Sequence, residues 1–577
     1  MYDRFPYIPA GSGDECFRGW PEIGHRLRTR TGSRSIVVVE CYPGVFEDEV
    51  QHGLSLALPG ARFLRTAELL RAAEEIGAML GPSLTDDPVF GRMNSIEIED
   101  FFDPGKLAAA QRRCADAVDE MLVVLGTGAS LVCENPDILV YADLARWEIQ
   151  MRQRRNEIGN LGADNLRERP SLKYKRAFFV DWRSADRLKV RLLDRIDVLL
   201  DTNVPHQPKA ITGDVFRRSL AEIVKRPFRV VPFFDPGPWG GHWMERVCGV
   251  PAGDAPNHAW CFDCVPEENS LLLGFVDARV EVPSVNLVFA HPEQLLGKEV
   301  YARFGAEFPI RFDLLDTMGG GNLSLQVHPL TAYIREHFGM DYTQDESYYL
   351  LDAEDGACVY LGLKEGIDPA AMLRDLEKAQ KGDFEFPAES YVNRFPARKH
   401  DHFPIPAGTV HCSGKGSMVL EISATPYIFT FKLWDWGRLG LDGRPRPVHL
   451  AHGAANIQWD RTTEWVRRSL INRVEPIAKG DGWREERTGL HALEFIETRR
   501  HWFTAAVPHD TCGTVNVLNL VEGDEVVVES PSGAFVPFQV HYAETFIVPA
   551  AVGAYTIRPC GPSASRECGT IQARVRV

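Results

Sequence analysis

The pattern of hydrophobic and polar positions divides the chain into two kinds of sequence. Up to about residue 215, short apolar runs alternate with segments of helical spacing, whereas from Pro227 onward strand-like runs are separated by proline and glycine turns. The first pattern is typical of an α/β domain and the second of an all-β domain. The sequence therefore predicts domains of different class in one chain.

Two apolar runs in the first part are expected to form buried strands of a parallel sheet. Residues 35–40 and 137–143 show no regular polar alternation, as expected for strands that are covered on both faces. Residues 63–80 and 107–125 have helical spacing and are predicted to be helices, and residues 200–203 are predicted to be a further strand. This alternation predicts an α/β layout.

The predicted α/β domain covers residues 32–215 and follows a loosely structured lead-in, residues 1–31. Its first strand is followed by a glycine turn and a helix, which is the layout of a phosphate-binding loop. The lysine and the magnesium-binding hydroxyl of such a loop are missing, and Glu47, Asp48 and Glu49 stand at that point. Because these carboxylates repel a triphosphate, we predict that the domain does not bind ATP with magnesium.

The candidate chemistry of the second part begins in the strand predicted at residues 323–329. Polar and apolar residues alternate there, so Ser324, Gln326 and His328 share one face. A glutamine and a histidine two residues apart can bind one metal ion. Such a pair also occurs by chance on the wet face of an ordinary strand, so the pair by itself leaves both interpretations open.

Two later stretches favour the metal interpretation. Residues 345–351 form a predicted strand with carboxylates at its start, and residues 405–412 form a turn and a strand that carries His411. Two imidazoles, one carboxylate and one amide oxygen suit a zinc ion. The sequence therefore predicts a zinc site that is assembled from strands distant along the chain.

Helices interrupt the strands of the second part, and further strands follow them. Residues 331–338 and 368–381 have helical spacing and are predicted as a helical insert. Residues 464–577 are predicted to form a second barrel without a metal site, because we find no histidine and carboxylate set there. Its predicted strands are residues 493–496, 515–520, 525–528 and 545–549.

Composition narrows the classes of function. The chain has 577 residues, with 64 Lys plus Arg against 80 Asp plus Glu, so its formal charge is −16. This charge disfavours nonspecific binding to nucleic acids and to anionic membranes. We find no membrane-length apolar run and no signal-peptide core, so we expect a cytoplasmic protein. The pair Cys261 and Cys264 lies in a strand-like run and is interpreted as packing.

Short motifs, in order, connect the second part of the chain to a known family. They are Pro238-Trp239-Gly240-Gly241, Gln326-Val327-His328-Pro329, Glu346-Ser347-Tyr348-Tyr349, Pro406-Ala407-Gly408-Thr409-Val410-His411, Leu420-Glu421-Ile422 and Phe431-Lys432-Leu433-Trp434-Asp435. This set resembles the type I phosphomannose isomerases, which are zinc-dependent cupins. The resemblance implies an all-β double cupin (jelly roll) with a helical insert. Its metal-binding cupin would cover residues 216–463 and its metal-free cupin residues 464–577.

The same resemblance implies a ligand set and a reaction. Zinc, one ion per chain, would be held by Gln326, His328, Glu346 and His411. The reaction would be the isomerisation of a phosphorylated sugar, mannose 6-phosphate to fructose 6-phosphate or a related pair. The partner would then be a small sugar phosphate, with no nucleic acid and no membrane involved.

Two positions depart from the family pattern. Typical members carry an arginine where this chain has Lys432, and a lysine where it has Gln344. Lysine keeps the positive charge but loses the planar, bidentate fork of arginine. We therefore expect Lys432 to be the catalytic cation nearest the reacting oxygens of the sugar, in an active site with altered cations.

The first part of the chain resembles another family, the small-molecule kinases of the nucleoside and uridine type. The resemblance rests on Phe101-Phe102-Asp103-Pro104 and on the arginine-rich segment after Asp143. Because the phosphate-binding loop is missing, it implies a degenerate P-loop-kinase-like architecture and not kinase activity. The cluster Arg152, Arg154 and Arg155 is either a relic of a phosphate lid or a solvated helix face, and we favour the second interpretation.

Three functions follow from these observations. The leading hypothesis is a zinc-dependent aldose–ketose isomerase that acts on a sugar phosphate. The alternative is a catalytically altered protein that binds or senses a sugar or its phosphate, because both the phosphate loop and the usual cations are changed. A two-step kinase–isomerase is disfavoured by the acidic run at residues 47–49.

Overall fold

The computed structural model describes two compact units. It covers residues 1–32, 35–116, 120–382, 384–424, 426–489 and 491–577. One unit, here called the α/β unit, consists of Tyr7–Glu222 and Glu268–Ala290. The other, the β unit, consists of Met1–Pro6, Ile223–Glu267 and His291–Val577. None of the described helices has the length and apolar character that crossing a membrane requires.

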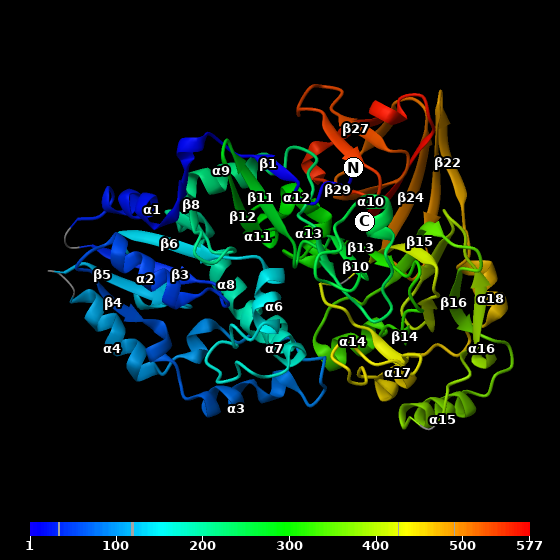
Figure 1. The fold of residues 1–577 in the computed structure, drawn as a ribbon, viewed down its shortest axis with the longest axis horizontal. Helices are drawn as coiled ribbons and strands as arrows, with labels where there is room; N and C mark the ends of the chain where they lie inside the picture. Colours follow the sequence, from blue (N-terminus) through cyan, green and yellow to red (C-terminus); the bar gives the residue numbers. More distant parts are fainter. Residues whose placement is uncertain (33–34, 117–119, 383, 425, 490) are drawn as a thin grey trace. The chain divides into compact units, whose positions relative to one another are not determined.

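The α/β unit is built on one seven-stranded sheet, whose central strands are parallel (Figure 1). Val37, Val38 and Val39 are fully buried, because helices cover both faces of a parallel sheet. The strands predicted at residues 35–40 and 137–143 are thereby confirmed. In spatial order the strands are β2 Cys16–Arg18, β8 Lys209–Thr212, β7 Val198–Asp201, β6 Ile138–Asp143, β3 Ile36–Cys41, β5 Leu122–Gly126 and β4 Arg62–Arg65.

The winding of this sheet reverses around β3. From β3 the chain passes to β4 and back to β5 on one side, and then to β6 and β7 on the other. A 3₁₀ turn at Thr66–Leu69 follows β4, and a π-helical turn at Ala177–Asp181 precedes the eighth helix. The helices are α1 Gly19–Arg28, α2 Glu47–Ala57, α3 Ala73–Leu84, α4 Pro104–Ala115, α5 Ala129–Val132, α6 Arg146–Arg154, α7 Pro170–Arg176, α8 Trp182–Leu192, α9 Gly213–Ile223 and α11 Val285–Ala290.

Two predicted helices were wrong in part, because each included a strand. Residues 62–65 form β4 before α3 begins, and residues 122–126 form β5 after α4 has ended. Apolar spacing over a few residues suits a helix and a buried strand equally. The parallel pairing of β4 with β5 decides between them, and that pairing is a tertiary contact.

The predicted domain boundaries also need correction. Residues 1–31 are not a loose lead-in, because they contain β1 Tyr7–Pro9, β2 and α1. Strand β1 pairs in parallel with β11 Ser270–Phe275, which pairs with β12 Ala278–Pro283. The α/β unit therefore includes residues 268–290, which the prediction assigned to the metal-binding domain. Pairing between segments so far apart leaves no local signal in the sequence.

The first part of the β unit is a pair of antiparallel sheets. This arrangement confirms that this part of the chain consists largely of β-sheet. One sheet runs β18 His402–Ile405, β15 Glu346–Ala353, β20 Ser417–Ser423, β13 Arg311–Asp316, β10 Trp260–Cys264 and β9 Phe233–Asp235. The other runs β17 Val392–Pro396, β16 Cys358–Leu363, β19 His411–Ser413, β14 Leu325–Val327 and β21 Phe431–Trp434.

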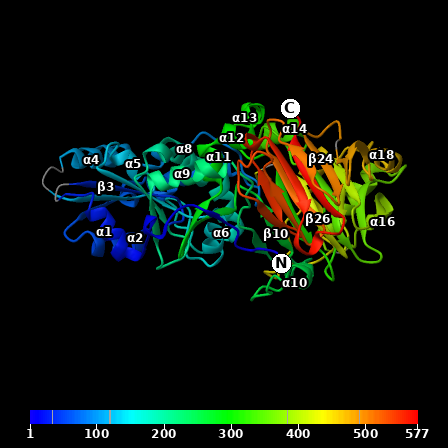
Figure 2. The ribbon, with the colours of Figure 1, turned by 90° about the horizontal axis from the view of Figure 1, so that it is seen from above.

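A second pair of sheets follows, and both contribute to one apolar core. Leu518 and Phe546 from one sheet and Val528 and Ile557 from the other are all fully buried in it. Strands β24 Ile496–Phe503 and β26 Asn516–Glu522 lie in one sheet (Figure 2). The other strands of that sheet are β22 Glu475–Gly480, β23 Trp483–Gly489, β31 Cys568–Val575 and β29 Thr545–Val548. The smaller sheet contains β25 Val507–Asp510, β30 Ala554–Pro559, β27 Glu525–Glu529 and β28 Phe538–His541.

The helical insert lies where the sequence predicted it. The predicted helices at residues 331–338 and 368–381 correspond to α14 and α15.

The predicted strand at residues 493–496 is wrong, since β24 begins only at Ile496. The helices of the β unit are α10 Trp243–Cys248, α12 Pro292–Leu296, α13 Lys298–Phe304, α14 Thr331–Phe338, α15 Pro369–Gln380, α16 Ala388–Tyr391, α17 Leu450–Asn456 and α18 Thr463–Ser469.

The Trp-Gly-Gly motif packs against the first residue of β10. Trp239 is 1% exposed and meets Trp260 edge to face, with ring centroids 4.6 Å apart. A Cβ atom at Gly241 would lie 2.4 Å from the backbone oxygen of Met318, so only glycine fits there. Cys261 and Cys264 are buried with free thiols, in agreement with the packing interpretation.

Arg152 contradicts the predicted solvated helix face. Its side chain is fully buried, whereas Arg154 is exposed. The guanidinium donates hydrogen bonds to the backbone oxygens of Gly44 (2.9 Å) and Thr202 (2.6 Å) and pairs with Glu148 at 3.1 Å. It therefore joins the loop after β3 to the end of β7, which a solvated residue cannot do.

We predict that Arg152→Met destabilises the protein by about 3 kcal/mol or more, because it leaves buried carbonyl groups and a carboxylate without their charged donor. The exposed change Arg154→Met is the matched control and is expected to stay within about 0.5 kcal/mol. Calorimetric unfolding of the full chain measures both. Equal stability of the two variants would show that Arg152 is not a structural clamp.

Candidate metal centre

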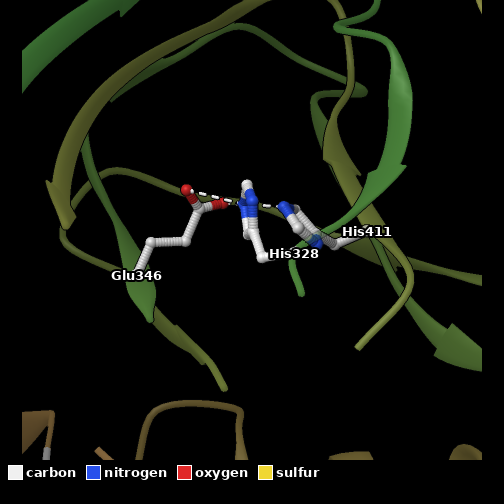
Figure 3. A group of neighbouring side chains, drawn as sticks. All are labelled: His328, Glu346 and His411. Atoms are coloured by element: carbon white, nitrogen blue, oxygen red, sulfur yellow. Dashed lines mark ion pairs between the residues drawn. The ribbon is translucent and has the colours of Figure 1, made fainter. Parts of the chain in front are cut away.

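Three side chains from facing sheets meet inside the first sandwich of the β unit (Figure 3). The carboxylate of Glu346 lies 3.1 Å from Nε2 of His328 and 2.7 Å from Nε2 of His411. All three side chains are fully buried, and their candidate ligand atoms lie within 4.8 Å of one another. The structure thus brings together three of the four predicted ligands around one point.

The hydrogen bonds behind the imidazoles decide which nitrogen faces that point. Nδ1 of His328 lies 2.8 Å from the backbone oxygen of Phe429, and Nδ1 of His411 lies 2.8 Å from that of Thr409. Since a carbonyl only accepts, each Nδ1 carries a proton, and in its neutral form each ring presents the lone pair of Nε2 toward Glu346. Second partners of this kind orient histidines that bind metals.

These atoms fit a cation. Nε2 of His328 and Oε1 of Glu346 are buried and have no hydrogen-bond partner, so two lone-pair donors face each other in a dry interior. Burial alone would raise the pKa of Glu346, but the two imidazoles hold it well below its usual value. Burial would lower the pKa of His328, and Glu346 raises it instead. A divalent ion bound by all three would relieve this arrangement.

A tight turn sets the position of His411. The turn ends at Gly408, whose φ is +88° and whose backbone N–H donates to the backbone oxygen of His328 at 3.0 Å. A Cβ atom there would lie 2.7 Å from the side chain of Gln458. Glycine therefore lets the chain fold back so that β19 starts at His411, opposite β14.

Gln326 has a cross-strand partner on each of its two neighbouring strands. It is the cross-strand partner of His411 on one side and of Lys432 on the other. Paired residues point to the same face, so all three side chains share the interior face. The amide nitrogen of Gln326 lies 3.2 Å from Nε2 of His411, and a half-turn of the amide brings its oxygen to that position.

Lys432 is half-buried, and its side-chain ammonium group makes no hydrogen bond or ion pair with the residues that the structure describes. Burial lowers its pKa to about 7, with further lowering by Arg446 and Arg438 against the opposing effect of Asp435. Arg446 and Arg438 both pair with Asp435, at 3.1 and 2.7 Å. Sequence reasoning missed Arg446, because it lies in a loop outside every motif.

Gln344 acts on the site through Glu346. Its amide nitrogen donates to Oε2 of Glu346 at 3.2 Å, and its amide oxygen accepts the backbone N–H of Phe429 at 2.8 Å. The backbone oxygen of the same residue, Phe429, orients His328. Gln344 therefore holds the carboxylate in place, at a position that sequence reasoning treated only as a missing lysine.

Two further polar side chains were not assigned a role from the sequence. Tyr348 is fully buried, its hydroxyl has no hydrogen-bond partner, and its ring meets His411 edge to face at 5.8 Å. Glu421 is the cross-strand partner of Tyr348, and burial raises its pKa well above the usual value, with a further contribution from Glu346. Burial therefore favours the neutral form of Glu421. In the sequence, only their position within two of the family motifs could have pointed to Tyr348 and Glu421.

The second sandwich also contains a buried pair of histidines. The rings of His501 and His509 lie 4.2 Å apart, and Nε2 of His501 lies 3.6 Å from Glu485. Sequence reasoning found no histidine and carboxylate set there, so it missed this group. Among the described residues, the single cluster with metal-binding geometry is nevertheless that of His328, Glu346 and His411.

Comparisons with known proteins relate different parts of the chain to different groups. Residues 19–225 match a family model described as a domain of unknown function, DUF8485. The mannose-6-phosphate isomerase of Streptococcus mutans is 28% identical over 214 residues, which are 37% of this chain and 61% of that protein. The probable mannose-6-phosphate isomerase GmuF of Bacillus subtilis is 30% identical over 147 residues, which are 25% of this chain and 43% of that protein.

Two solved structures align with a larger share of this chain. The mannose 6-phosphate isomerase of Bacillus subtilis aligns with 60% of this chain and 99% of its own, at 17% identity and a TM-score of 0.48. A mannose 6-phosphate isomerase bound with zinc and yttrium aligns with 61% of this chain at 14% identity and a TM-score of 0.45. In sequence, the match spans 43% to 61% of the first two relatives. The chain is thus similar in sequence to mannose-6-phosphate isomerases over part of their length.

Proposed function

We propose that the protein is a zinc-dependent aldose–ketose isomerase of the mannose-6-phosphate isomerase type. The proposal includes one zinc ion per chain, a sugar phosphate as substrate, a cupin assignment for both sandwiches and a cytoplasmic location. The observation that carries it is the convergence of two imidazole Nε2 atoms on the buried carboxylate of Glu346. The sequence similarity to enzymes of that name supports the reaction.

His328, Glu346 and His411 would hold the ion, and Gln326 would supply the fourth ligand. When bound, the ion supplies a Lewis acid that polarises a sugar oxygen. Gln344 and the carbonyls of Phe429 and Thr409 keep the ligands oriented. The buried sandwich interior excludes water from these groups, which strengthens each electrostatic contact.

Lys432 is the proposed catalytic residue. Isomerisation moves a proton between two neighbouring carbons, and charge develops on the sugar oxygens during the transfer. Lys432 shares a face with Gln326 and His411 and has an ammonium group without a competing partner among the described residues. It can therefore direct a positive charge toward a sugar oxygen, although without the two parallel hydrogen bonds of an arginine.

A second function has a specific observation behind it. Gln344 is engaged with Glu346 and Phe429, so the position that carries a lysine in the resembled family offers no cation to a phosphate. A protein that binds a sugar or its phosphate without turnover would fit this change. Under this alternative the metal centre serves recognition alone.

The direct test is an assay that detects fructose 6-phosphate formed from mannose 6-phosphate by the full chain loaded with zinc. We expect turnover that is lost on chelation and restored by zinc. Calorimetric binding of mannose 6-phosphate without any product would favour the binding protein instead. Neither binding nor turnover would refute both proposals for this substrate.

We predict that His328→Ala and His411→Ala each reduce the zinc content from about one ion per chain to nearly none. Each change removes one imidazole nitrogen from the set of ligands that would hold the ion. Elemental analysis of the purified variants measures this. His337→Ala, an exposed histidine on α14, is the matched control and should keep its zinc. Full zinc content in the double variant would show that the site lies elsewhere.

For Gln344→Met we expect the zinc affinity to fall by about 10–100-fold, as is typical when a partner that orients a metal ligand is removed. Competition with a chromophoric chelator measures the affinity. Gln380→Met changes an exposed glutamine at the end of α15 and serves as control. An unchanged affinity in Gln344→Met would mean that Glu346 is held by other contacts.

Lys432→Ala should keep its zinc and lower kcat/KM for mannose 6-phosphate by about 10²-fold or more, since it removes the cation at the reacting oxygens. Lys415→Ala, which removes an exposed lysine, should leave kcat/KM unchanged. Steady-state kinetics together with elemental analysis separate the two effects. A fully active Lys432→Ala variant would assign the catalytic cation to another residue.

A further inference from the structure

A cavity of about 250 Å³ opens within the α/β unit, at the carboxyl ends of β3, β4 and β5. It belongs to this unit alone and has no part in the candidate metal centre. The residues that line it are Pro43, Gly44, Val45, Glu47, Thr66, Ala67, Leu70, Thr127, Ile149, Gln153, Ile158, Gly159, Asn160, Leu161, Gly162, Ala177, Asp181 and Trp182.

The cavity lies where an open α/β sheet places its ligands. Such sheets bind ligands outside the carboxyl ends of the strands, at the point where the winding reverses. Here the winding reverses around β3, and the loop after β3 forms one wall. The π-helical turn at Ala177–Asp181 forms another, and π-helical turns are frequent at functional sites.

Two of the lining side chains carry buried polar atoms that lack partners. Gln153 is 2% exposed, and its side-chain oxygen accepts no hydrogen bond. Trp182 is fully buried, and its indole N–H donates none. A buried polar atom without a hydrogen-bond partner destabilises the folded protein. A ligand that offers both a donor and an acceptor would satisfy both atoms.

The charges of the lining exclude an anion. Glu47 and Asp181 are both carboxylates, and none of the lining residues that the structure describes is a lysine or an arginine. Glu47 begins α2 and accepts the backbone N–H of Thr127 at 3.3 Å. A phosphate placed at the N-terminus of α2 would therefore meet the negative charge of its first residue.

The same carboxylates do not require a cationic ligand. Glu47 pairs with Arg65 at 3.3 Å, and Asp181 pairs with Arg176 at 3.4 Å and accepts from Asn160 at 2.7 Å. Both negative charges are therefore balanced from outside the cavity. The lining atoms that still lack a hydrogen-bond partner, the side-chain oxygen of Gln153 and the indole N–H of Trp182, belong to neutral groups. They suit a neutral ligand with several hydroxyls.

We propose that this cavity binds a neutral, unphosphorylated monosaccharide. Its volume lies below the range of about 300–1,000 Å³ for sites that take drug-sized ligands, which limits the ligand to a single small ring. Trp182 is the only aromatic residue among the described lining, and Arg146 and Tyr174 pack against its ring. The cavity therefore offers no free aromatic face for a nucleobase to stack on.

The experiment is isothermal titration of the full chain with D-mannose, D-glucose, D-fructose and D-ribose. Mannose 6-phosphate and ATP with magnesium are titrated for comparison. We expect at least one free sugar to bind in a 1:1 complex, and Gln153→Leu to weaken that binding at least tenfold. ATP with magnesium should not bind. Gln111→Leu, an exposed glutamine of α4, is the matched control and should bind like the parent.

A second pair of variants separates this cavity from the metal centre. His411→Ala should keep the binding of the free sugar, whereas Ala67→Phe, which fills the exposed rim of the cavity, should abolish it even if Gln153→Leu fails to fold. Loss of binding in His411→Ala, unchanged binding in Ala67→Phe, or no binding of any of the four sugars would overturn the proposal. The isomerase proposal does not depend on any of these results.

Discussion

The candidate site depends on one constraint, the burial of the Glu346 carboxylate against two imidazole nitrogens. Both rings are locked by hydrogen bonds from Nδ1 to backbone carbonyls, so both Nε2 atoms present lone pairs to an anion. Such a set is stable in a dry interior only with a proton or a cation between its members. Gln344, the turn at Gly408 and the register of β14 all serve to hold this geometry.

In the α/β unit, Glu47 places a negative charge at the beginning of α2. Its carboxylate is the first side chain of α2, accepts the backbone N–H of Thr127 and pairs with Arg65. A phosphate would then meet negative charge where it needs positive charge. The cavity beside it retains neutral hydrogen-bonding groups, of which Gln153 and Trp182 lack partners.

The two units therefore combine different kinds of site. The candidate metal centre concentrates charged groups in a buried interior, where electrostatic contacts are strong. The cavity of the α/β unit balances its charges and suits recognition of a neutral molecule. Arg152, which was expected on a solvated face, instead joins the loop after β3 to β7 and so supports one wall of that cavity.

The sequence by itself determined the class of each part and most of the metal site. The apolar run predicted as a strand at residues 35–40 and the alternation around Gln326 are local patterns, so they predict strands and their faces directly. The motifs likewise identified His328, Glu346 and His411. Only the tertiary structure decided that residues 62–65 and 122–126 are strands, that residues 268–290 return to the α/β unit, and that Gln344 and Arg446 contact Phe429 and Ser324. These features rest on contacts between segments far apart in the chain, and such contacts leave no periodic signal in the residues that make them.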